Sequence, residues 1–178
     1  MNSDDIPMCG VPVHAMDGYL EKLIRFGHRV AVCEQAETPE NFKKQGGKGP
    51  LPRAVVRVVT AGTLSEDGLL DPSQNNFLAA IGHANGDLAM AWADMSTGIF
   101  QVQPINESSI LTTIERLNPA ELLYPDGVDF IVSMVKEHPS AFAVSPENFD
   151  SVTSQKNIAE FFPKECSITE FSRSQLTA

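Results

Sequence analysis

The sequence predicts an α/β protein made of two units, a small one at the N-terminal end and a larger one after it. Apolar residues recur at helical spacing in several segments, and short Val- and Ala-rich runs between turn residues are typical of strands. Charge marks the division. Residues 1–63 hold eight Lys/Arg and seven Asp/Glu, whereas residues 64–178 hold five and sixteen, so the net charge of −10 lies in the second part.

Composition indicates an intracellular setting. Cys9, Cys33 and Cys166 lie far apart and form no Cys-x-x-Cys pair, which argues against a disulfide framework and against a zinc cluster. No signal peptide is recognisable, and no window approaches the roughly 20 apolar residues of a membrane span. We therefore expect a cytoplasmic protein that has no membrane partner.

The first unit is predicted to fold as helix, strand, short helix and strand. These elements are expected at residues 14–26, 29–35, 38–44 and 54–60. Thr38 is the expected N-cap of the short helix, with Pro39 at its first position. The predicted apolar side of the first helix follows intervals of three and four residues: Met16, Tyr19, Leu20, Leu23 and Ile24.

A basic, glycine-rich stretch joins the short helix to the Val-rich strand. No acidic residue occurs between Asn41 and Leu64, and the glycines and prolines of residues 46–52 exclude regular structure there. The same interval contains five cationic residues: Lys43, Lys44, Lys48, Arg53 and Arg57. In an acidic chain, this is where a polyanion can bind. The alternative is a solvated loop that carries ordinary surface lysines.

The second unit is predicted to begin after a polar connection at residues 64–76. Three strands in meander order are followed by alternating helices and strands, with Asn85-Gly86 as a hairpin turn and Ser108 as a helix N-cap. The expected strands are 77–81, 88–93, 99–102, 121–124 and 142–144, and the expected helices are 108–117, 130–136 and 149–162. Residues 167–178 are weakly patterned. This order is that of a ribonuclease H-like mixed sheet.

Asp94 is the one candidate for metal chemistry. It opens the sequence Asp-Met-Ser-Thr-Gly between two predicted strands, and an aspartate of the first strand binds catalytic metal in ribonuclease H-like nucleases. A plain turn has the same composition, because Asp and Ser bond their own backbone and Gly98 adopts positive φ. A two-metal site needs several converging carboxylates, and the other acids show no such spacing. We favour the turn and expect neither catalytic nor metal-binding residues.

Five sequence blocks together resemble the N-terminal region of the MutS family of DNA mismatch-repair ATPases. They are IPMCGVPVH at residues 6–14, RVAVCEQ at 29–35, VVRVVTAGT at 55–63, DMSTG at 94–98 and NPAELLY at 118–124. The resemblance implies a fragment. Residues 1–62 are similar to the later part of the mismatch-binding domain, and residues 63–178 are similar to a connector domain, truncated before its last helix.

The resemblance also limits the function. The Phe-x-Glu motif that reads the mismatch in this family lies upstream of Ile6 and has no counterpart here, and the ATPase domain, which uses ATP and Mg²⁺, is missing. We therefore expect a non-enzymatic fragment without a cofactor. Its expected role is weak double-stranded DNA backbone contact through Lys43, Lys44, Lys48 and Arg53.

Two protein partners follow, together with an alternative function. The connector of the family implies docking of a MutL-like repair partner. The edge of the strand at residues 54–60 predicts a homodimer. The alternative is a ribonuclease H-like metal-dependent nuclease centred on Asp94.

Overall fold

The structure is a computed structural model that describes residues 10–65, 69–161 and 171–178, and it divides the chain into two compact units. Unit 1 is Met1–Thr60 and unit 2 is Ala61–Ala178. In unit 1, the 3₁₀ helix η1 (Val13–Ala15) leads into α1 (Met16–Arg25). The other elements are β1 (Val30–Gln35), α2 (Pro39–Lys44) and β2 (Arg53–Val59). The predicted order of elements is confirmed.

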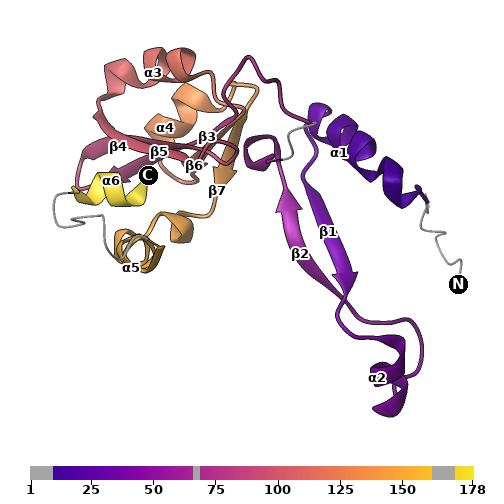
Figure 1. Cartoon of the computed structure of the whole chain (residues 1–178). Helices are drawn as coiled ribbons and strands as arrows, with labels where there is room; N and C mark the ends of the chain where they lie inside the picture. The colour runs from indigo at the N-terminus through magenta and orange to yellow at the C-terminus, as the bar shows by residue number, and fades with distance from the viewer. Residues whose placement is uncertain (1–9, 66–68, 162–170) are drawn as a thin grey trace, which may run out of the picture. The chain divides into compact units, whose positions relative to one another are not determined.

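Unit 1 is an antiparallel two-stranded ribbon with a helix beside it. β1 pairs with β2 from Val30↔Val59 to Gln35↔Arg53, with a bulge between Val32 and Cys33. α1 lies alongside the ribbon, and α2 with the loop after it forms the tip beyond the strand ends (Figure 1). Gly27 follows α1 with a φ of 79°, the left-handed conformation that commonly ends a helix.

Only part of the predicted apolar side of α1 is buried, which corrects the sequence prediction. Leu20 and Ile24 are 5% and 6% exposed, whereas the side chains of Met16, Tyr19 and Leu23 are exposed. The physical reason is the size of the partner surface, because one narrow two-stranded ribbon covers a single stripe of a helix. The apolar residues of α1 therefore form two stripes, and one of them faces solvent.

Unit 2 is a five-stranded mixed sheet with helices on both faces, which confirms the predicted fold class. The sheet order is β5-β4-β3-β6-β7. β3, β4 and β5 pair in antiparallel fashion, and β6 and β7 add in parallel next to β3. The strands are β3 (Phe77–Ala84), β4 (Asp87–Asp94), β5 (Ile99–Ile105), β6 (Glu121–Pro125) and β7 (Ala141–Val144).

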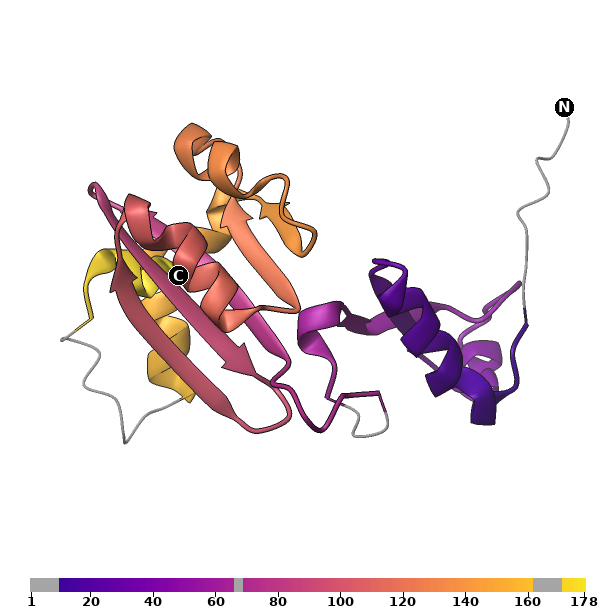
Figure 2. The ribbon, with the colours of Figure 1, turned by 90° about the horizontal axis from the view of Figure 1, so that it is seen from above.

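The helices of unit 2 lie in two layers. α3 (Ile110–Leu117) and α4 (Asp129–Val135) cover one face of the sheet, and α5 (Ser151–Phe161) and α6 (Arg173–Thr177) lie on the other (Figures 1 and 2). The remaining helical turns are η2 (Ala61–Thr63), η3 (Glu107–Ser109) and η4 (Pro146–Phe149). No helix in the described part of the chain combines the length and apolar character that a membrane span requires.

The core of unit 2 lies between the sheet and the layer formed by α3 and α4. Ile81, Met90 and Leu122 are fully buried on the sheet side, and Ile114 and Val135 meet them from the helices. Trp92 belongs to this cluster and is 7% exposed, so its side chain packs in the core. Burial of such side chains stabilises the fold by about 1.5–3 kcal/mol each.

Two local predictions in unit 2 meet different outcomes. Asn85 and Gly86 have φ values of 57° and 88°, so the Asn-Gly hairpin turn is confirmed. The N-cap predicted at Ser108 is wrong. Asn106 is the cap: its Oδ1 accepts the Ser109 N–H at 3.0 Å, and Ser109 Oγ accepts the Asn106 N–H. Asn is as strong a cap as Ser, and the cap lies two residues earlier than predicted.

The weakly patterned tail contains a helix that the sequence analysis missed. α6 is short, and its N-cap Ser172 forms a capping box with Gln175. Its anchor is Gly82 in β3, where an added Cβ would lie 2.5 Å from the Ser174 carbonyl oxygen and also against the Ala178 backbone nitrogen. The missing side chain of Gly82 is what lets the backbone of α6 approach the sheet. Residue 162 of the predicted last helix and residues 167–170 of the tail lie outside the described residues.

We expect Gly82→Ala to displace α6, because both obstructing groups are backbone atoms that cannot rotate away. The expected loss is about 1–3 kcal/mol in the free energy of unfolding of unit 2, with reduced hydrogen-exchange protection at residues 173–178. Gly18→Ala is the control, since nothing lies within 4 Å of its added Cβ and the site is helical. Unchanged protection of α6 in the Gly82 variant would contradict this account.

Candidate nucleic-acid interface

The basic residues predicted to contact DNA lie at the tip of the unit 1 ribbon. Lys43 and Lys44 form the last turn of α2, Lys48 lies in the loop after it, and Arg53 is the first residue of β2. Figure 1 shows α2 beyond the end of the two strands. The side chains of all four residues are exposed. The fold thus places residues that are up to ten positions apart in the sequence at one end of the unit.

Local hydrogen bonds build this tip. The Thr38 side chain accepts the Asn41 N–H at 3.4 Å, which confirms Thr38 as the N-cap of α2. The Gly47 N–H donates to the Phe42 carbonyl at 2.9 Å, and a Cβ on Gly47 would lie 2.5 Å from the Phe42 ring. The Ala36 N–H donates to the Pro52 carbonyl and closes the base of the tip. The basic residues are therefore carried on a folded turn.

The electrostatics of the tip favour an anion. Among the described residues, none of Lys43, Lys44, Lys48 and Arg53 pairs with an acidic side chain. Lys43 and Lys44 also complement the negative end of the α2 dipole, which supplies a structural reason for two of the charges. Lys48 and Arg53 have no such role in the helix. Exposed cations without partners retain their full attraction for a phosphate backbone.

Asp94, the candidate for metal binding, ends β4 and holds the turn into β5. The N–H and the hydroxyl of Ser96 donate to Asp94 Oδ1 at 2.9 and 2.6 Å, and the Thr97 N–H donates to the same oxygen at 3.3 Å. Gly98 has a φ of 73°, and its N–H donates to the Asp94 carbonyl. This geometry supports the turn interpretation.

The second carboxylate oxygen of Asp94 bonds to another segment. Asp94 is 1% exposed, and its Oδ2 accepts the Asn76 N–H at 3.1 Å. Burial is the largest influence and favours the neutral acid, but the donors of Ser96, Asn76 and Thr97 together outweigh it, so the pKa of Asp94 lies below its ordinary value. Within the described ranges, no group of three or more His, Cys, Asp or Glu side chains is placed to hold a metal ion.

Comparison with known proteins identifies the family. The chain matches the family model of MutS domain I over residues 1–68 and that of MutS domain II over residues 76–178. It belongs to the MutS family. The DNA mismatch repair protein MutS of Bartonella quintana (strain Toulouse) is 44% identical over 189 residues, which cover 98% of this chain and 20% of that protein. The MutS of Ruegeria pomeroyi is 45% identical over 162 residues, covering 89% of this chain and 18% of its own.

This MutS chain therefore spans about a fifth of the length of the curated relatives it matches. The domain I match covers unit 1 and the first eight residues of unit 2, to residue 68, and the domain II match covers the rest of unit 2 from residue 76. The basic tip lies within the part that matches MutS domain I, and the Asp94 turn lies within the part that matches MutS domain II. The two candidate sites thus belong to different domains of the family.

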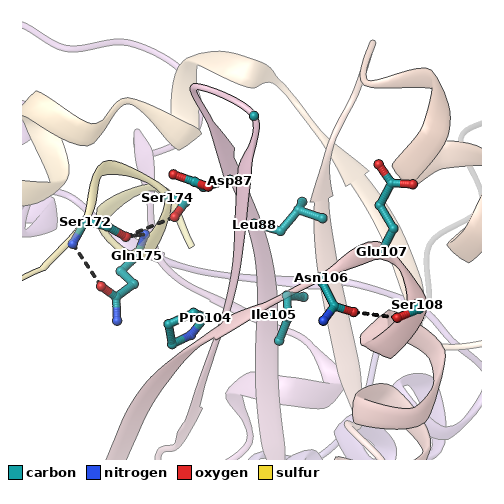
Figure 3. Close-up of a pocket in the computed structure, with 11 residues that line it drawn as sticks. Asp87, Leu88, Pro104, Ile105, Asn106, Glu107, Ser108, Ser172, Ser174 and Gln175 are labelled. Atoms are coloured by element: carbon teal, nitrogen blue, oxygen red, sulfur yellow. Dashed lines mark hydrogen bonds between the residues drawn. The ribbon is translucent and has the colours of Figure 1, made fainter.

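Open cavities occur among the described residues of unit 2, and two of them bear on the candidate sites. The larger, of about 750 Å³, lies between the β3–β4 turn, the end of β5 and α6 (Figure 3). Its polar groups largely bond one another: Asn106 Oδ1 accepts the Ser108 hydroxyl, and Gln175 Oε1 accepts the Ser172 N–H. The smaller, of about 410 Å³, lies beside the Asp94 turn. Among the described residues that line them, neither presents a buried polar side-chain atom that lacks a partner.

Sequence reasoning missed the buried partners of the Asp94 turn. The Asn76 side chain donates to the Ala61 carbonyl at 2.9 Å, and Glu121, 2% exposed, accepts the Gly62 N–H at 3.1 Å. Their local sequence gave no signal, because each bond joins residues between 15 and 59 positions apart. The sequence does repeat an Asp-x-Ser pattern, and in both copies the aspartate bonds the serine: Asp71 bonds Ser73, and Asp94 bonds Ser96. This pattern indicates the local bonds of a turn only.

We expect Asp94→Asn to reduce the free energy of unfolding of unit 2 by about 1–3 kcal/mol at neutral pH. Because the pKa of Asp94 is lowered in the folded state, its stabilisation is complete above the unfolded-state pKa, about 3.9, and is lost as the pH falls through the lower, folded-state pKa. Urea unfolding between pH 7 and pH 3 measures both effects. The difference between wild type and variant should shrink at the acid end.

The matched control is Asp87→Asn, at an exposed carboxylate in the first residue of β4. It should leave stability nearly unchanged at both ends of the pH range. An Asp94→Asn variant as stable as wild type at neutral pH would show that the turn does not depend on this carboxylate.

Proposed function

We propose that this chain acts as the DNA-contacting and partner-coupling part of a MutS mismatch-recognition protein. In this proposal, residues 1–62 are the later part of the mismatch-binding domain and residues 63–178 are the connector. The observation that carries it is the exposed basic tip in a chain that matches MutS domains I and II. The relatives that match are named DNA mismatch repair proteins, which supports DNA as the ligand.

The proposed contact is with the phosphate backbone. Lys43, Lys44, Lys48 and Arg53 provide up to four phosphate contacts, which release counterions and bind any sequence alike. The proposed site consists of these basic side chains and includes no aromatic wedge. Without an inserted group, nothing offsets the free-energy cost of bending or unstacking a mismatched duplex. ATP and Mg²⁺ chemistry is assigned to no residue of this chain.

Weak DNA binding without mismatch preference is the expected result. Matched and G·T-mismatched duplexes should bind equally at low salt. The logarithm of the binding constant should fall against the logarithm of salt concentration with a slope of at most about −3 to −4, as for four phosphate contacts. Fluorescence anisotropy with both duplexes at several salt concentrations measures this. A clear preference for the mismatch would contradict the proposal.

Charge reversal tests the tip itself. Lys48→Glu combined with Arg53→Glu should abolish measurable binding, because it replaces two attractions with two repulsions. Lys136→Glu combined with Lys156→Glu makes the same change of charge at two lysines of unit 2 and is the matched control. Equal losses in both variants would mean that net charge, and not the tip, governs binding.

We also propose that unit 2 docks a MutL-like repair partner through an exposed row on η3 and α3. Glu107, Leu111 and Glu115 are four residues apart and all exposed, with Leu111 at 51%. Four-residue spacing places side chains on one side of a helix. An apolar residue between two acids suits a partner surface that is basic around an apolar contact. The acidic excess of residues 64–178 would speed such an encounter.

Glu107→Lys combined with Glu115→Lys should weaken binding of MutL to this chain at least tenfold at low salt, measured by biolayer interferometry. Glu21→Lys combined with Glu40→Lys repeats the charge change on unit 1 and serves as its control. Binding that survives the change on α3, or disappears with the change on unit 1, would place the docking surface elsewhere.

A second copy of the chain is the third proposed partner. Among the described residues, β2 pairs with β1 alone, and Val55, Val56 and Val58 are 51–58% exposed. An exposed apolar strand edge is a site for pairing with another chain. The free edge of β2 is thus one route to the homodimer.

A further inference from the structure

The turn between β3 and β4 exposes two groups that can react with each other. Asn85 and Gly86 form this turn with φ values of 57° and 88°, and both residues are exposed. Among the described residues, neither the Asn85 side-chain amide nor the Gly86 N–H has a hydrogen-bond partner. A Cβ added to Gly86 would have nothing within 4 Å, so open space surrounds this residue. The amide and the N–H next to it are therefore free and accessible.

The chemistry open to this pair is an intramolecular acyl transfer. The Gly86 nitrogen loses its proton to hydroxide and attacks Cγ of Asn85. The C–N bond of the side-chain amide breaks, and its nitrogen takes a proton from water and leaves as ammonia. The product is a succinimide ring. Water then opens the ring: attack at Cγ leaves an ordinary aspartate, and attack at the main-chain carbonyl leaves isoaspartate, whose backbone runs through Cβ.

Glycine at the next position is what makes the nitrogen a usable nucleophile. Gly86 has no side chain to shield its nitrogen, and its backbone rotates more freely than that of any other residue. Ring closure rotates Asn85 out of the left-handed conformation, so the turn must first open. An exposed loop tip is among the parts of a fold that open at the lowest free-energy cost.

Other asparagines of the chain lack a free nucleophile. Asn118 has a positive φ of 46°, as in the β3–β4 turn, but Pro119 follows it and has no N–H. The nucleophile for Asn75 is the N–H of Asn76, which donates to Asp94 Oδ2 at 3.1 Å. The conformation of Asn118 and the exposure of Asn75 alone are thus not enough for the reaction.

We propose that Asn85 is a site of spontaneous deamidation in the folded chain, with the Gly86 nitrogen as the attacking group. The two products are aspartate and isoaspartate at position 85. This inference uses neither the basic tip nor a partner surface, so it does not depend on the function proposed above.

The modification changes the end of the β3–β4 hairpin in two ways. Each event adds a carboxylate next to Asp87, in a chain whose net charge is already −10. Isoaspartate also lengthens the backbone of a two-residue turn by one carbon, so Ala84 and Asp87 no longer meet in register across it. Gly86 and Asp87 line the larger cavity opposite Ser174 (Figure 3), so the wall of that cavity changes with the turn.

The test follows the full chain during incubation in mildly alkaline buffer at physiological temperature. Ion-exchange chromatography separates the more acidic product, and peptide mass spectrometry with electron-transfer fragmentation locates aspartate and isoaspartate. Both should form at position 85, and the isoaspartate fraction should lose hydrogen-exchange protection at residues 84–88. Asn85→Gly is the matched control and should abolish the product, because Gly-Gly also suits a two-residue hairpin turn.

Asn118 is the internal reference and should keep its amide throughout. A second incubation in urea gives the rate for the unfolded chain. Product that forms in urea but not in the folded chain overturns the proposal, because the native turn then protects Asn85. An acidic product that forms equally in Asn85→Gly, or that maps first to another asparagine, overturns it as well.

Discussion

Two buried carboxylates hold the beginning of unit 2 to its sheet. Asp94 accepts the backbone of Asn76 at the start of β3, the Asn76 side chain holds the Ala61 carbonyl, and Glu121 accepts the Gly62 N–H. A buried charge without such donors would cost several kcal/mol, so the bonds and the burial depend on each other. Gly62 is required because a Cβ there would lie 2.8 Å from the Glu121 Cβ. These bonds fix the positions of Ala61, Gly62 and Asn76 relative to the central strands.

The two units bury their apolar side chains to different extents. Unit 2 closes a core between a five-stranded sheet and two helices, with Ile81, Met90 and Ile114 at most 1% exposed. Unit 1 has two strands and one flanking helix, so valines of β2 and half of the apolar side of α1 remain in solvent. Small folds bury a smaller fraction of their surface. The contact surfaces proposed for unit 1 therefore belong to the same secondary-structure elements that form the unit.

The sequence predicted the order and type of nearly every element, because those depend on local patterns. The Asn85-Gly86 turn and the Thr38 cap follow from residue type and local order alone. The misses depend on tertiary contacts. α6 has little pattern of its own and is held by the gap at Gly82, and the exposure of Tyr19 and Leu23 depends on the width of the sheet that α1 meets. For the candidate site, sequence gave the four basic residues, while their gathering at one tip required the fold of α2 and its loop.

Charge separation would allow this acidic chain to approach DNA at the proposed tip. The attraction at the tip acts over about one Debye length, roughly 10 Å at 0.1 M salt, and residues 42–63 contain no acidic group to oppose it. The repulsion originates from the sixteen acids after residue 63, and salt screens it over the same length. Added salt weakens the phosphate contacts of the tip through counterion release. It also screens the repulsion between two copies of the chain. If the proposed contacts form, low salt favours the tip on DNA and high salt favours apolar contact between chains. One electrostatic asymmetry would then set opposite conditions for the two contacts proposed for unit 1.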